Sequence, residues 1–350
     1  MTFYHYFILS CFNSNHSMRI STLYHLLKGK KTASILSYGY FYNVLDYFYL
    51  FPKLKEDSYL EMIAQLKEEN YLVDTEEGAV QISKKGIKII NEEVLFPNLE
   101  YLNQLHYYKW DIKVWQRLIF TTQVLSEKSY KERNYLPIEN SLYRQQQLKR
   151  WLNMQSENII PKFYEEWLLL TEYLSIQQQT YIFKQLVGHE HIGETLQQIA
   201  EEHDVDIIFA YLEFKNAVHQ LIFLIEQKHE KFPVFFDIIQ IEKGLVKEES
   251  SLITKEIFIK NKSIKEISMI RNLKESTIVD HLIEIYLVQG EKNNLLFISD
   301  DKINQLNEYR KEKPDFRKWV YKEAVSAVSG LTFYEFKMFQ FSLVEQEKIE

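Results

Sequence analysis

The sequence has a single cysteine, Cys11, among its 350 residues. A disulfide framework and a zinc site with several thiolate ligands both need more than one thiol, so both are excluded. The apolar run from Phe3 to Phe12 is shorter than the ~20 residues that cross a bilayer, and no positively charged segment precedes it. We therefore expect a cytoplasmic protein that is neither exported nor embedded in a membrane.

Glycine and proline are also scarce, at 9 and 6 residues. This leaves little turn-forming material for many short strands, whereas 46% hydrophobic and 15% aromatic residues supply ample apolar surface for packed cores. The fold class expected is mainly α. At ~100 to 200 residues per domain, a chain of this length should contain several domains.

Basic residues are fewer than acidic residues, and the formal net charge is -7. Binding of phosphates needs Lys and Arg, so a surface covered with nucleic acid is unfavourable and any contact must come from local patches. The main basic segment, from Tyr107 to Trp151, has nine basic residues against four acidic ones. We take its C-terminal part as a secondary basic patch: Lys131, Arg133, Arg144, Lys149 and Arg150.

The sequence contains no recognisable catalytic motif. The glycines form neither a phosphate-binding loop nor a dinucleotide fingerprint, and no Gly-x-Ser-x-Gly elbow occurs. His189 and His191 flank Glu190 at a spacing that does not let two imidazoles share a zinc ion on a helix. We expect a protein that is not an enzyme and holds no cofactor and no metal.

The first unit expected is winged-helix-like and spans residues 18–95. Two helical stretches, Thr32–Tyr49 and Lys55–Asn70, lead into two short β-prone runs on either side of Gly78, which predict a hairpin. Residues 1–17 show no clear periodicity, and two alternatives are open for them, an over-extended start or a loose N-terminal extension.

Three further units are expected after this one. Residues 96–185 are predicted to form a helical bundle, and residues 186–245 a helical domain with a helix-turn-helix-like pair that begins at Thr195. The second helix of that pair is so apolar that it fits a core helix better than a DNA-reading helix. The last unit, 246–350, contains a clearer helix-turn-helix.

The helix-turn-helix prediction rests on the segment from Ser251 to Gly290. Ser263 and Glu266 have the spacing of a capping box, which marks a helix start. Asn272 occupies the turn, where a left-handed backbone is usually needed and Asn is well tolerated. A third helix is expected from Lys274 to about Val288.

The N-terminal half of that third helix is the part that enters the major groove in known helix-turn-helix complexes. We therefore assign DNA contact to its outer residues and to the cations near the turn: Lys260, Lys262, Lys265, Arg271, Lys274, Glu275, Ser276, Thr277, Val279 and Asp280. The third helix itself carries several acids and no Arg, the residue that makes the strongest contact with guanine. We expect modest affinity for duplex or forked DNA. The alternative interpretation is that the outer face of this helix binds a protein.

The segments Ser263–Ile267 and Arg271–Leu282 resemble the helicase-associated helix-turn-helix at the C-terminus of many RecQ-type DNA helicases. With its N-terminal winged unit, the whole chain resembles the free-standing YpbB-like proteins that are encoded beside a RecQ helicase in low-GC Gram-positive bacteria. The resemblance implies a non-catalytic partner of a RecQ-type helicase in DNA repair or replication. The chain departs from the usual motif at Ser268, where Ala is commoner, and at Asn272, where Gly is commoner.

Two other functions stay open. A sequence-specific transcription regulator would use the same helix-turn-helix, and a protein adaptor without DNA contact would bury it against a partner. The segment from Tyr309 to Trp319 mixes basic and aromatic residues, which suits either stacking of a single strand or an exposed helix joint.

Overall fold

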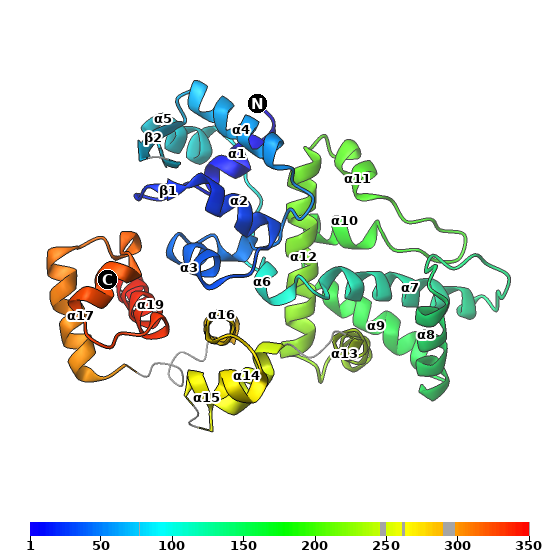
Figure 1. Cartoon of the computed structure of the whole chain (residues 1–350). Coiled ribbons are helices and arrows are strands. Elements are labelled where there is room, and N and C mark those ends of the chain that lie inside the picture. The colour runs from blue at the N-terminus through cyan, green and yellow to red at the C-terminus, as the bar shows by residue number, and fades with distance from the viewer. Residues whose placement is uncertain (77, 246–249, 261–262, 290–297, 350) are drawn as a thin grey trace. The chain divides into compact units, whose positions relative to one another are not determined.

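The computed structural model describes residues 1–76, 78–245, 250–260, 263–289 and 298–349 (Figure 1). Helices make up most of these residues, and one small sheet of three strands is present. The expected fold class, mainly α with several helical parts, is confirmed.

The described chain divides into two compact units, each made of segments that are far apart in sequence. Unit 1 contains Met1–Asn13, Met62–Val73 and Ile82–Lys247. Unit 2 contains Ser14–Glu61, Asp74–Gln81 and Glu248–Glu350. The four consecutive domains expected from the sequence differ from this division, because Ser14–Glu61 belongs to the same compact unit as Glu248–Glu350, whereas Met1–Asn13 belongs to the other unit.

The winged element has the expected order of two helices and a hairpin, preceded by one more strand, β1, and one more helix, α2. Its elements are β1 (Met18–Arg19), α2 (Ile20–Lys28), α3 (Ala33–Phe41), the 3-10 turn η1 (Leu45–Tyr47), α4 (Glu56–Glu68), β2 (Leu72–Glu76) and β3 (Ala79–Ile82). The sheet order is β1-β3-β2, and Met18 pairs with Val80 in antiparallel register. The hairpin predicted around Gly78 is therefore present.

The helix predicted from Thr32 to Tyr49 is shorter in the structure. Thr32 caps α3 by accepting a hydrogen bond from the Ile35 amide, and the helix ends at Phe41. Asn43 and Tyr49 then adopt positive φ angles, 55° and 60°, which no α-helix can include. The backbone turn at these two residues is a tertiary feature that helical spacing alone did not reveal.

The alternative of a loose N-terminal extension is wrong. Residues Phe3–Ser10 form α1, and its Phe7, Ile8 and Leu9 are buried within unit 1. The Phe3 ring lies 5.4 Å from the ring of Phe209 in an edge-to-face arrangement. A helix of eight residues is marginal by itself, so packing against the rest of unit 1 stabilises it.

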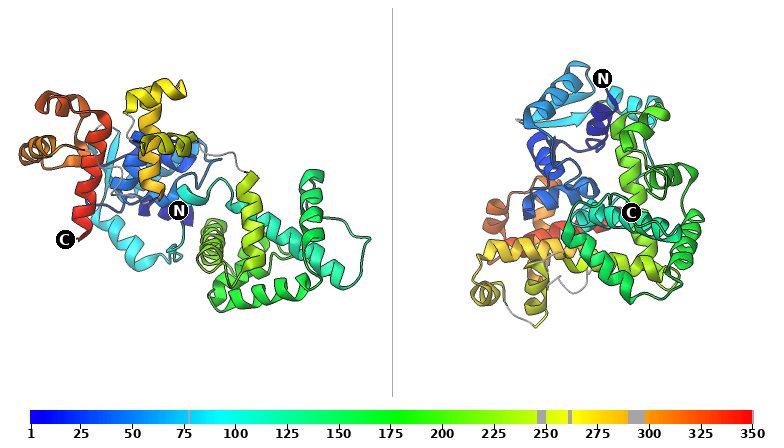
Figure 2. Two further views of the ribbon diagram at one scale, coloured as in Figure 1. Left: turned by 90° about the horizontal axis from the view of Figure 1, so that it is seen from below. Right: turned by 90° about the vertical axis from the view of Figure 1, so that its right-hand side faces the viewer.

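The remaining helices of unit 1 follow the winged element. They are α5 (Lys84–Lys88), the π-helical turn η2 (Ile89–Glu93), α6 (Gln104–Tyr107), α7 (Asp111–Ser129), α8 (Leu142–Met154), α9 (Ile159–Thr171), α10 (Ile176–Phe183), α11 (Leu196–Glu202), α12 (Ile207–Gln227) and α13 (Pro233–Leu245). The long α12 runs through the unit, with α10, α11 and α13 packed against it (Figures 1 and 2). Among the helices of the described residues, α12 is the one long and apolar enough to cross a bilayer, but 78% of its apolar window is buried inside the protein. It is thus a core helix, as its composition indicated.

A buried polar cluster joins α7 to α12. Asp111 accepts hydrogen bonds from Lys215 and, at 2.9 Å, from His219 Nε2, while the Asn103 amide donates to His219 Nδ1 at 3.0 Å. Because Nδ1 accepts, the proton of the neutral ring is on Nε2. Burial lowers the pKa of His219 to about 4, so the ring stays neutral at physiological pH. Both ring nitrogens are occupied, which makes this cluster structural.

The C-terminal helices of unit 2 are α14 (Ser250–Phe258), α15 (Ile264–Arg271), α16 (Glu275–Gln289), α17 (Asp300–Glu312), the 3-10 turn η3 (Phe316–Lys318), α18 (Tyr321–Ala327) and α19 (Phe333–Ile349). The aromatic side chains of the Tyr309 to Trp319 segment are buried: Tyr309, Phe316 and Trp319. Trp319 stacks parallel to Phe339 and its indole N–H donates to the Lys313 carbonyl. These rings are part of the hydrophobic core. Both interpretations of the segment, a platform for stacking of a single strand and an exposed helix joint, are therefore wrong for its aromatic side chains.

Candidate nucleic-acid interface

The turn of the helix-turn-helix is built as the sequence predicted. Ser263 Oγ accepts from the Glu266 amide at 3.2 Å, and the Glu266 carboxylate accepts from the Ser263 amide at 2.8 Å, which completes the capping box. Asn272 ends α15 in the left-handed conformation, with φ 50° and ψ 45°. Ser268 Oγ donates to the Leu273 carbonyl at 2.6 Å, so this departure from the usual Ala adds a hydrogen bond within the turn.

The third helix, α16, packs its inner side against α14 and α15. Ile278, Leu282 and Ile285 are fully buried there, as their spacing predicted. Thr254 Oγ1 of α14 and His281 Nδ1 of α16 lie 2.8 Å apart. The core of the helix-turn-helix was therefore readable from periodicity.

The outer side of α16, to which DNA reading was assigned, is partly covered by α3. The Ala33 amide at the first turn of α3 donates to Asp280 Oδ1 at 2.7 Å, and Lys31 forms an ion pair with Glu284. A carboxylate at a helix N-terminus is favourable because the first amides there have no intrahelical partner. Val279 is 7% exposed. The prediction that Val279 and Asp280 face outward to read bases is wrong, since both are in contact with other parts of unit 2.

The rest of that outer side lines a cavity of about 580 Å³. Glu275, Ser276, Val279 and Asp280 of α16 form one wall, and the start of α3 and residues 330–334 contribute others. The lining includes two carboxylates and no Lys or Arg. A recognition helix must enter the major groove with a free outer face, so this arrangement opposes base reading by α16.

Cations lie around the turn instead. Lys260, Lys265 and Lys274 are exposed, whereas Thr277 is half-buried and Lys262 lies outside the described residues. Arg271 is directed back to α14, donating to Thr254 Oγ1 at 2.5 Å and to Ser250 Oγ at 2.9 Å. In the described part of this domain, three of the cations assigned to DNA are therefore exposed for phosphate contact. Arg271 instead connects α15 to α14.

The winged element adds little positive charge. Its α4 helix, which follows α3 in the order of a winged helix, carries four acids and one lysine: Glu56, Asp57, Glu61, Glu68 and Lys67. Phosphate repulsion by these carboxylates disfavours α4 as a DNA-reading helix.

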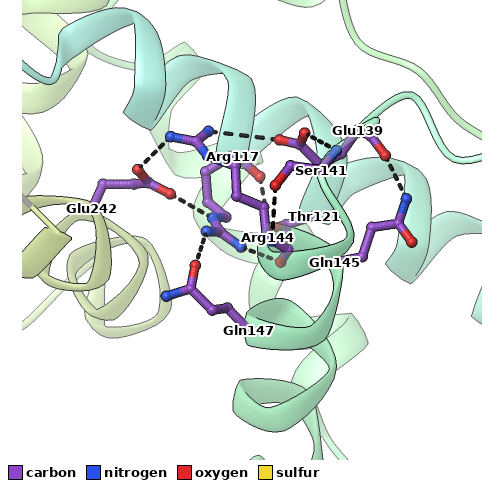
Figure 3. Close-up of polar contacts among 8 residues, drawn as sticks. All are labelled: Arg117, Thr121, Glu139, Ser141, Arg144, Gln145, Gln147 and Glu242. Atoms are coloured by element: carbon purple, nitrogen blue, oxygen red, sulfur yellow. Dashed lines mark hydrogen bonds and ion pairs between the residues drawn. The ribbon is translucent and has the colours of Figure 1, made fainter.

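The secondary basic patch is divided by the structure. Lys149 and Arg150 on α8, and Lys131 and Arg133 after α7, are exposed. Arg144 is not part of an open patch: its Nη2 donates to Glu242 at 3.1 Å, and the side chain of Glu242 is fully buried (Figure 3). The expectation that Arg144 is open to phosphate is therefore wrong, because a neighbouring helix supplies its counter-ion.

Arg144 belongs to a buried ionic network that sequence reasoning missed (Figure 3). Arg117 of α7 donates through Nε to Glu242 of α13 at 2.7 Å and through Nη2 to Gln147 of α8 at 3.0 Å. Its Nη1 donates to the Arg144 carbonyl at 2.9 Å. The network fastens α8, with Lys149 and Arg150 on it, to α7 and α13. A single sequence offers no signal for it, since its partners are up to 125 positions apart.

No metal centre emerges from the part of the chain that the structure describes. No group of three or more His, Cys, Asp or Glu side chains is placed there to hold an ion. His189 Nδ1 lies 2.8 Å from the Glu127 carboxylate and its ring stacks on Tyr130.

Comparison with known proteins supports the helix-turn-helix. A family model described as a helix-turn-helix domain matches residues 250–340. Protein YpbB of Bacillus subtilis (strain 168) is 24% identical over 273 residues, which cover 76% of this chain and 77% of that protein. No solved structure matches the chain. The resemblance to YpbB-like helix-turn-helix proteins is thereby confirmed, and the domain it contains indicates DNA binding.

Proposed function

We propose that this YpbB-like helix-turn-helix protein is a non-catalytic, cytoplasmic accessory protein that binds DNA and acts with a RecQ-type helicase in DNA repair or replication. The observation that carries the DNA-binding part is the helix-turn-helix domain at residues 250–340 with exposed lysines around its turn. The helicase part rests on the resemblance of the segments from Ser263 to Leu282 to helicase-associated domains.

The geometry favours contact with phosphates over reading of bases. Lys265 and Lys274 flank the turn, while the base-reading side of α16 faces α3 and an acidic cavity. Phosphate contacts position a protein on DNA but carry no sequence information directly. Binding to duplex and forked DNA should therefore depend steeply on salt and weakly on sequence.

Charge reversal at the turn tests this mode. In the Lys265→Glu, Lys274→Glu double variant, we expect affinity for duplex and forked DNA to fall at least about tenfold, because two attractive phosphate contacts become repulsive. The slope of log affinity against log salt should become shallower by ~2. Fluorescence anisotropy with labelled duplex, fork and single strands between low and moderate salt measures both quantities.

The matched control is Lys84→Glu, Lys88→Glu on α5, where both lysines are exposed and the change in net charge is the same. Unchanged affinity in this control together with loss at the turn supports local contact. Equal loss in both variants would mean that net charge alone governs binding, and equal affinity of the turn variant and the wild type would contradict DNA contact at the turn.

The helicase part has its own test. The tagged full-length protein is recovered from a nuclease-treated lysate of its own cells, and co-purifying proteins are identified by mass spectrometry. We expect a RecQ-type helicase to be retained without DNA. A lysate that contains the helicase but yields none of it on the tagged protein would contradict the partnership.

A protein adaptor without DNA contact is the second candidate. The specific observation in its favour is that Asp280 and Val279, which should face DNA, are engaged within the protein. It predicts retention of the helicase together with no affinity for DNA at low salt. The same covering of α16 argues against a sequence-specific regulator, which needs direct base contacts.

A further inference from the structure

Unit 2 contains a second cavity, of about 330 Å³, whose chemistry is opposite to that of the acidic one beside α16. Arg19, Arg317, Lys318 and Lys337 line it, and Glu76 is the carboxylate in its lining. Its walls come from the winged element, from the η3 turn and from α19. Four cations against one carboxylate give the lining an excess of positive charge.

Lys337 is the most informative of these cations because it is buried and has no acidic partner among the described residues. Its side chain is 9% exposed, and its ammonium donates to Gln340 Oε1 at 2.8 Å. The ammonium lies over the rings of Phe41, Phe333 and Phe336, with 5.2 to 5.7 Å to their centroids. The ring faces attract the cation, but a buried ammonium that lacks an anion still carries a large desolvation cost. Two of its three donors remain for a ligand in the cavity.

The other cations are held in defined positions. Arg317, with its side chain 8% exposed, donates through Nε to the Phe41 carbonyl at 3.2 Å and pairs with Glu347, which lies outside the lining. Lys318 pairs with Glu76 at 2.5 Å, and Asp315 caps the same turn. Arg19 is exposed at the cavity and forms no ion pair with the described residues. Among the described residues, Arg19 and Lys337 are thus the two lining cations that form no ion pair.

We propose that this cavity is a binding site for a phosphoryl group, held by Lys337 and Arg19. A phosphoryl group supplies the acceptor oxygens and the negative charge that these donors lack, and Arg and Lys are the residues that bind it best. The cavity is at the small end of the range for ligand pockets, about 300 to 1,000 Å³, so it suits a nucleotide-sized ligand and not a duplex. Tyr42, which is half-buried in the lining, offers ring surface beside such a group.

The phosphoryl group can belong to the end of a nucleic-acid strand or to a free nucleotide. The site does not depend on the helicase partnership, and the strand version deepens the proposed DNA binding. Isothermal titration of the full-length protein at low salt uses four probes: inorganic pyrophosphate, deoxyadenosine 5′-monophosphate, and a short oligonucleotide with either a 5′-phosphate or a 5′-hydroxyl. Tighter binding of the 5′-phosphorylated strand than of the 5′-hydroxyl strand assigns the site to strand ends; binding of pyrophosphate and the mononucleotide with no such difference assigns it to free nucleotides.

Two variants keep the test decisive. Lys337→Met retains side-chain length without charge, and Arg19→Ala changes an exposed residue whose backbone carbonyl still accepts from Tyr38. Each is expected to weaken phosphoryl binding at least about tenfold, whereas Lys322→Met, at an exposed lysine of α18, leaves it unchanged. Absence of binding by all phosphorylated probes, or equal binding by Lys337→Met, Arg19→Ala and wild type, would overturn the site. If the site is overturned but the protein still binds duplex DNA, the proposed function remains supported. If the protein binds the phosphoryl probes but not duplex DNA, only the proposed function is overturned.

Discussion

Replacement of Glu242 by alanine is expected to lower the free energy of unfolding of unit 1 by about 3–5 kcal/mol. The Glu242 carboxylate is fully buried and accepts from Arg117 Nε at 2.7 Å and from Arg144 Nη2 at 3.1 Å. Its removal leaves the buried Arg117 guanidinium without a counter-ion, and the cost of an uncompensated buried charge exceeds that of any single hydrogen bond. Chemical denaturation followed by tryptophan fluorescence reports on this unit, because Trp115 and Trp151 lie in its core.

The matched control for this change is Glu139→Ala in the same network. Glu139 lies 3.6 Å from Arg144 Nη1 and accepts from the Ser141 amide at 2.8 Å, but its side chain is partly exposed, so the expected loss is about 1 kcal/mol, well below that for Glu242→Ala. Equal denaturation midpoints for Glu242→Ala and Glu139→Ala would show that the network does not fasten α8. Replacing Arg117, Arg144 and Glu242 together by Met is expected to recover much of the stability, because apolar packing carries no desolvation cost.

The second large effect is the contribution of Lys337 to the dependence of stability on pH. Burial lowers the pKa of Lys337 from 10.5 to about 8. Below pH 8 the lysine is protonated in both the folded and the unfolded chain, and the folded state carries the full cost of the buried charge, ~3 kcal/mol from the pKa difference. Between pH 8 and 10.5 the folded chain releases a proton that the unfolded chain keeps, so stability rises with pH in this window.

The Lys337→Met variant isolates this contribution. Methionine can fill the space between the three phenylalanine rings and has no proton to lose. At pH 7 and in the absence of phosphate we expect the variant to be more stable than the wild type, and we expect the difference to shrink as the pH is raised to 10. Thermal denaturation of both proteins from pH 7 to 10 measures it. A constant difference over that range would contradict a lowered pKa of Lys337.

Stabilisation by Lys337→Met and weaker phosphoryl binding in the same variant would have one cause. A cation kept in a buried position at a cost in stability is a common property of binding sites. The ligand then compensates the charge, so phosphate should stabilise the wild type more than the variant.

The features that the sequence by itself determined are local ones. The capping box of Ser263 and Glu266 and the left-handed turn at Asn272 involve residues within a few positions of each other. The buried positions Ile278, Leu282 and Ile285 follow from the helical period. The hairpin around Gly78 was predictable in the same way, because a turn and its flanking strands are contiguous in the chain. These features depend on backbone geometry and on hydrogen bonds between residues that are close in the sequence. One sequence is therefore enough to predict them.

The tertiary structure alone decided which surfaces remain open. Asp280 looked like an outward residue of a recognition helix, but it bonds to Ala33, which is 247 positions away. Arg144 looked like part of a basic patch, but Glu242 of another helix neutralises it. Lys337 could not be predicted as a site residue, because its aromatic surroundings come from Phe41 as well as from its own helix. Helical periodicity predicts which side of a helix is apolar. The partner of a polar side chain depends instead on how segments that are distant in the sequence pack against each other. That packing produces no periodic pattern in the sequence.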